Sequence, residues 1–80
     1  MRIRNKSEIK STLGRTMLNE TEVLFLQLSC SEKTYKEIAM VMNLNPRGVD
    51  NLRDNLFTKL DVKSRVGLAM YAIRHGLVTI

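Results

Sequence analysis

A stretch near the middle of the chain, residues 35–52, constrains the fold more than any other. Asn43 stands where a left-handed residue would end a helix, and asparagine tolerates that conformation. Asn45 can then cap a new helix that Pro46 begins, because proline suits the first helical position. Apolar side chains recur at helical spacing on both sides of this break: Ile38, Ala39 and Met42 before it, and Val49, Leu52 and Leu56 after it.

The stretch therefore predicts a short helix, a tight turn and a second helix. Ala39 is small where two crossing helices must approach closely, and Leu44 can fill the corner between them. Two helices joined in this way form a helix-turn-helix, whose second helix enters the major groove of DNA.

Two further helices frame this pair. Asn19 and Glu22 form a capping box that starts a helix running to about Ser29. Ser64 caps a last helix over residues 65–75. No stretch shows a strand pattern long enough to build a sheet. The chain is therefore predicted to be all-α, with a four-helix domain over residues 18–80.

Residues 1–17 carry most of the net charge of +5, because they hold five basic residues and one acidic residue. Ile9, Leu13 and Met17 are spaced for a short helix, but the composition equally fits a basic N-terminal arm or linker. Residues 18–80 are almost neutral, with eight basic and seven acidic residues. The charge favours an anionic partner, whose binding then depends on where the charges of the domain lie.

The composition argues against several classes of protein. A single cysteine, Cys30, and a single histidine, His75, give no disulfide, metal-ligand cluster or nucleophile–base pair. We therefore expect no enzyme activity, no cofactor and no metal. No apolar run approaches the about 20 residues of a membrane span, and the polar start of the chain lacks a signal peptide pattern. A cytoplasmic location without membrane contact is expected.

Five blocks of the sequence together resemble the DNA-binding domain of the LuxR/FixJ/NarL type, found at the C-terminus of many bacterial response regulators. The blocks are residues 18–22, 35–39, 45–49, 59–65 and 71–78. The resemblance implies a transcription regulator whose third helix binds double-stranded DNA. It also implies a homodimer through the fourth helix, and an upstream receiver domain or RNA polymerase as further partners.

The resemblance assigns roles to three groups of residues. The exposed face of the third helix would read bases, since asparagine pairs with adenine and aspartate accepts from cytosine: Asp50, Asn51, Asp54 and Asn55. Basic residues beside the predicted groove and further along the chain would contact phosphates: Lys36, Arg47, Lys59, Lys63 and Arg65, the last with pairing to Glu22 as its alternative. The dimer contact would come from the fourth helix: Leu68, Tyr71, Ala72 and His75.

Several residues favour a second hypothesis, a protein-interaction module that keeps the helix-turn-helix scaffold. Asp50 and Asp54 are acidic where relatives often carry lysine, and acidic groups repel phosphate. Gly48 replaces a hydroxyl residue that would contact phosphate. The helix that begins after Asn19 also has an apolar side that one small core does not need, formed by Val23, Leu24 and Leu28.

Overall fold

The computed structural model describes residues 17–78, which form four helices and no strand. The helices are α2 (Glu20–Ser29), α3 (Tyr35–Met42), α4 (Pro46–Leu60) and α5 (Arg65–Arg74). The all-α prediction is confirmed, with α3 and α4 as the helix-turn-helix. The arm predicted over residues 1–17 lies outside the described residues except for Met17.

Local capping explains where the helices begin. The Asn19 side chain accepts a hydrogen bond from the Glu22 N–H at 2.8 Å, and the Glu22 carboxylate accepts one from the Asn19 N–H at 3.0 Å. Asn45 accepts from the Gly48 N–H at 2.7 Å. Asn43 adopts the left-handed conformation, with φ of 58°, and ends α3 as predicted. The turn of the helix-turn-helix is thus specified by its own residues.

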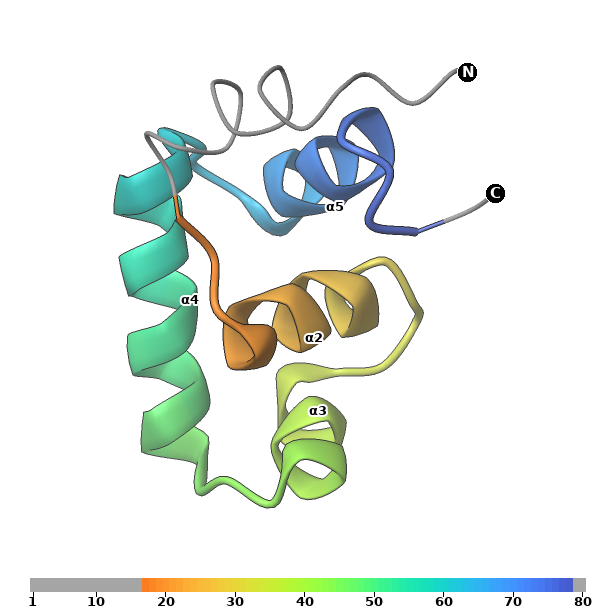
Figure 1. Ribbon diagram of the computed structural model, residues 1–80. Coiled ribbons are helices and arrows are strands. Elements are labelled where there is room, and N and C mark those ends of the chain that lie inside the picture. Colours follow the sequence, from red (N-terminus) through yellow and green to blue (C-terminus); the bar gives the residue numbers. More distant parts are fainter. Residues whose placement is uncertain (1–16, 79–80) are drawn as a thin grey trace.

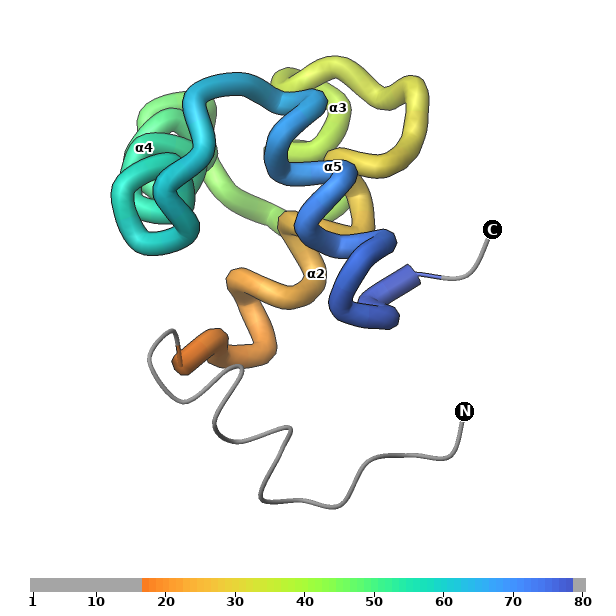
Figure 2. Tube along the Cα trace, turned by 90° about the horizontal axis from the view of Figure 1, so that it is seen from above, coloured from red at the N-terminus to blue at the C-terminus, as the bar shows by residue number. Residues whose placement is uncertain are grey.

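The helices pack around one small core, to which all four contribute. In Figure 1, α2 lies between α5 and α3, and α4 runs along the side of all three. Seen from above, α5 crosses over α2 (Figure 2). The buried apolar side chains are Phe25, Leu26, Ile38, Ala39, Val49, Leu56, Leu68 and Ala72. Because Val49 and Leu56 anchor one side of α4 in this core, its opposite side faces solvent.

The structure corrects the predicted orientation of α5. Leu68 and Ala72 were expected at a dimer contact, but both are 0% exposed and belong to the core. Their side chains therefore have no surface left for a second copy. The exposed stripe is instead formed by Val66, Met70 and Ile73, which are 67%, 52% and 43% exposed. Both sides of α5 are apolar, so helical spacing alone could not decide which side faces α2.

The connection between α4 and α5 turns tightly. Asp61 ends α4 in the left-handed conformation, with φ of 56°. The Val62 N–H then donates to the Phe57 carbonyl at 3.0 Å. A Cβ atom on Gly67 would lie only 2.9 Å from the Val62 Cβ, so this position has no room for a side chain. The close approach sets α5 against the end of α4.

Candidate nucleic-acid interface

The four residues predicted to read bases lie together on α4. Asp50, Asn51, Asp54 and Asn55 are all exposed and follow one side of the helix. Val49 and Leu56 point into the core from the opposite side. The helix-turn-helix therefore presents amide and carboxylate groups on the surface that such a motif inserts into DNA.

Arg53 pairs with both carboxylates of this face, a contact absent from the sequence-based site. Its Nε and Nη2 lie 3.0 Å from Asp54 Oδ1, and its Nη1 lies 3.4 Å from Asp50 Oδ1. The hydrogen bond to Asp54 raises the pKa of Arg53; burial opposes this, and the charges of both aspartates add to it. The i, i+3 spacing of Asp50 and Arg53 was the signal that could have shown this contact.

An aromatic platform supports Arg53. Its guanidinium carbon lies 5.5 Å from the ring centre of Tyr35 and 6.0 Å from that of Phe57. Tyr35 is itself stacked on the core residue Phe25, with ring centres 6.0 Å apart, and Arg65 lies 5.0 Å from the Tyr35 ring. Burial raises the pKa of Tyr35, although both guanidinium groups lower it. The platform links the polar face of α4 to the core.

Three of the predicted phosphate-binding side chains remain open to solvent. Lys36 lies in the first turn of α3, Arg47 in the first turn of α4, and Lys63 in the connection to α5. All three are exposed, and the described part of the chain offers them no ion pair or side-chain hydrogen bond. Their cationic groups are therefore available to an outside anion.

Lys59, also predicted to contact phosphate, is engaged in contacts within the domain. Its Nζ contacts Glu22 Oε2 at 2.9 Å, Glu22 Oε1 at 3.0 Å and the Met17 carbonyl at 3.0 Å. An ammonium group has three donors, and these contacts occupy all of them. Lys59 thus ties the end of α4 to the start of α2, and its phosphate contact stays a prediction.

The pairing of Arg65 with Glu22 was wrong. Arg65 donates instead from Nε to the Ser29 carbonyl at 3.1 Å and from Nη2 to the Ser31 carbonyl at 2.9 Å. It thereby satisfies carbonyl groups at the end of α2. A phosphate contact from its other donors stays a prediction.

Glu22 is nearly buried, and these contacts favour its charged form. Burial alone would raise its pKa, but hydrogen bonds from Lys59 and from the Asn19 N–H, with the charge of Lys59, lower the pKa below 4.5. The carboxylate thus serves as both a helix cap and an ion-pair partner.

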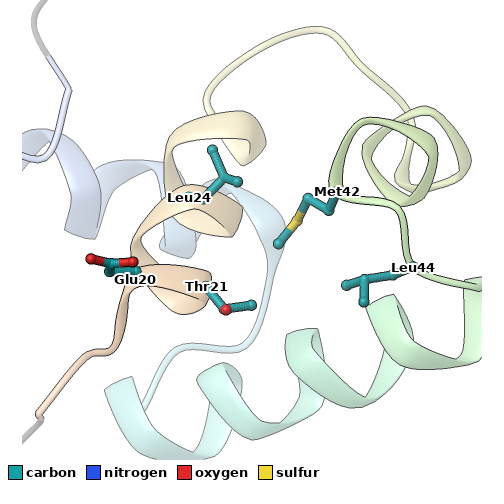
Figure 3. A pocket seen from close by; sticks show the side chains of 5 residues that line it. All are labelled: Glu20, Thr21, Leu24, Met42 and Leu44. Carbon is teal, nitrogen blue, oxygen red and sulfur yellow. The ribbon is translucent and has the colours of Figure 1, made fainter.

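A shallow apolar groove of about 260 Å³ lies between α2 and the helix-turn-helix. Leu24 lines it from α2, and Met42 and Leu44 face it from α3 and the turn (Figure 3). Glu20 and Thr21 form its rim. The apolar side that was predicted on α2 is only partly exposed to solvent, because Val23 and Leu28 are half-buried.

No three His, Cys, Asp or Glu side chains within residues 17–78 come together as a metal site. None of the helices described is both long enough and apolar enough to span a membrane.

In this structure two further helices frame the helix-turn-helix, and its second helix exposes a polar face. This arrangement is that of a DNA-binding domain. The sequence family described as "Bacterial regulatory proteins, luxR family" matches residues 16–72. The chain belongs to this family, as the resemblance predicted.

Relatives of the chain include bacterial response regulators. It is 41% identical to the uncharacterized response regulatory protein YgeK of Escherichia coli K12 over 63 residues, which are 79% of this chain and 43% of YgeK. It is 35% identical to the response regulator UvrY of the same strain, over 75% of this chain and 28% of UvrY. For the response regulator GacA of Pseudomonas viridiflava the identity is 32%, over 78% of this chain and 29% of GacA.

The chain thus spans less than half the length of these relatives. No solved structure matches it.

Proposed function

We propose that this domain is a sequence-specific, double-stranded-DNA-binding regulator of transcription and acts as the output domain of a response regulator. The observation that carries the proposal is the face of α4, where Asp50, Asn51, Asp54 and Asn55 stand exposed on the second helix of a helix-turn-helix. Asparagine can pair with adenine in the major groove, and aspartate can accept from the amino group of cytosine. α4 thus supplies discrimination between bases.

The backbone grip in this proposal comes from side chains around α4. Lys36, Arg47 and Lys63 are exposed cations on three different segments of the domain. Phosphate contacts supply affinity that is independent of sequence and falls with salt. Arg65 and the basic residues 1–17 add to this attraction.

A second copy of the chain is part of the proposal. The exposed apolar stripe of Val66, Met70 and Ile73 on α5 has the i, i+4, i+7 spacing of a helix that packs against another helix. Pairing through α5 would place two α4 helices on half-sites about 10 base pairs apart or a multiple of that spacing. Tyr71 on α5 and His75 directly after it, whose ring centres lie 4.2 Å apart, stay predictions for this contact.

The setting of the domain is proposed from its relatives. The relatives are named as response regulators. We therefore place the domain in the cytoplasm, with an upstream receiver domain or RNA polymerase as its further partner.

The test compares binding to duplexes of random and selected sequence at two salt concentrations. Wild-type affinity for both should fall with salt. Arg47→Ala should weaken binding to all duplexes and flatten the salt dependence, whereas Asn51→Ala should relax the preference at one base position. Equal weakening of every duplex by Asn51→Ala would refute base reading at that residue.

The groove between α2 and the helix-turn-helix favours a second candidate function, a protein-interaction module with weak or no DNA binding. Leu24, Met42 and Leu44 give the groove an apolar lining that this core does not fill. The absence of any salt-dependent duplex binding at low salt would favour this alternative over the regulator.

A further inference from the structure

We propose that Arg53 is a positioning residue that sets the base preference of α4 by holding the carboxylates of Asp50 and Asp54. The inference rests on the proposed function, because it concerns how the same face reads DNA. Arg53 lies between the two aspartates on the helix and contacts both at once. It was not among the residues predicted to read bases.

The contacts orient one oxygen of each carboxylate. Arg53 engages Oδ1 of Asp54 through two nitrogens and Oδ1 of Asp50 through a third. Within residues 17–78, the Oδ2 atoms of Asp50 and Asp54 accept no hydrogen bond. Each therefore keeps its lone pairs for a donor on another molecule. The amino group of cytosine is such a donor in the major groove.

Arg53 is itself held in place by its surroundings. The rings of Tyr35 and Phe57 lie within 6.0 Å of the guanidinium carbon, and Tyr35 stacks on the buried Phe25. A planar guanidinium fits both the ring faces and the carboxylate oxygens. Arg53 thus restricts the two aspartate side chains before DNA binds. They then lose less conformational entropy when they contact a base.

Arg53 also offsets charge at this face. Two carboxylates alone would repel the phosphates on both sides of the groove. One guanidinium against two carboxylates leaves a single net negative charge, distributed over the trio. Without Arg53 the aspartates would be both freer to move and more repulsive to DNA.

The experiment measures affinity for a selected duplex and for duplexes changed at single positions. Arg53→Gln should reduce the preference at the positions read by the aspartates at least about fivefold, the low end of one good base contact. Arg53→Lys keeps the charge but loses the fork that holds Asp54. It should keep most of the general affinity and still lose the preference.

The same substitution in an Asp50→Asn, Asp54→Asn background separates positioning from direct contact with DNA. If Arg53 acts through the aspartates, Arg53→Gln should change the base preference less than about twofold in that background. Arg47→Gln is the matched control, since it removes a cation from the same helix and should weaken all duplexes alike. Circular dichroism and urea unfolding establish that each variant is folded.

The outcomes distinguish this inference from the proposed function. If wild-type protein prefers no duplex, the proposed function fails and the inference fails with it. If wild-type protein is selective but both Arg53 variants keep its preference, only the inference fails. An equal loss of affinity for every duplex in both backgrounds would make Arg53 an ordinary phosphate contact.

Discussion

Replacing Lys59 with methionine tests a polar contact that joins the end of α4 to the start of α2. The substitution removes an ammonium group that binds both oxygens of Glu22 and the Met17 carbonyl. Breaking a fully buried ion pair costs about 3–5 kcal/mol, because the remaining charge is left without a partner. Glu22 is only 8% exposed, but Lys59 is 35% exposed, so water can replace part of the lost contact.

We therefore expect Lys59→Met to lower the free energy of unfolding by about 1–2 kcal/mol. For a domain of this size, that loss corresponds to a fall in Tm of about 4–16 °C. Urea unfolding followed by circular dichroism measures the first quantity, and a thermal scan measures the second.

Lys63→Met is the matched control. Lys63 is exposed and lies four residues further along, so its substitution should change stability by less than about 0.5 kcal/mol. Its effect should appear instead in the salt dependence of duplex binding, because a phosphate contact would be lost. The reasoning would be refuted if Lys59→Met left stability unchanged and flattened the salt dependence as Lys63→Met does.

Three other predictions concern stability and assembly. Gly67→Ala should destabilise the domain by about 1–3 kcal/mol in urea unfolding, since its Cβ would lie 2.9 Å from Val62. Stability should fall as the pH drops below 4.5, because the unfolded state, in which Glu22 has its ordinary pKa, then binds a proton more readily than the folded state, in which that pKa is lowered. Glu22→Gln should make this fall in stability shallower. Met70→Glu should leave the fold intact and abolish self-association in analytical ultracentrifugation, whereas unchanged association would remove α5 from the dimer contact.

The parts of the fold that were predictable from sequence are local. Asn19, Asn43 and Asn45 act within a few residues of themselves, so their capping and turn roles follow from their neighbours. The exposed face of α4 was predictable for a related reason: its apolar residues recur with the helical period, which leaves the polar side outward.

The errors concern contacts between distant segments. Leu68 and Val66 are both apolar residues on α5, and only the position of α2 determines which one is buried. Glu22 needs a basic partner, and both Lys59 and Arg65 are candidates in the sequence. In the structure Lys59 pairs with Glu22, whereas Arg65 donates to the Ser29 carbonyl. Helical spacing carries no information on such choices, because they depend on the three-dimensional packing.

Arg53 is an intermediate case. Its spacing to Asp50 is local and favours an ion pair, whereas its contact with Tyr35 depends on how α3 crosses α4. The sequence predicts that Asp50 and Asp54 read bases or repel phosphate, but the charge pairing with Arg53 depends on the folded structure. The structure shows that the acidic face carries its own counter-charge.

The most direct test of base reading by α4 is selection of bound sequences from a pool of random duplexes. Wild-type protein should enrich a motif with two half-sites about 10 base pairs apart, or a multiple of this spacing. Asn51→Ala should enrich the same motif with one position relaxed in each half-site. Enrichment of no motif by folded wild-type protein, or an unchanged motif for Asn51→Ala, would contradict base reading by this face.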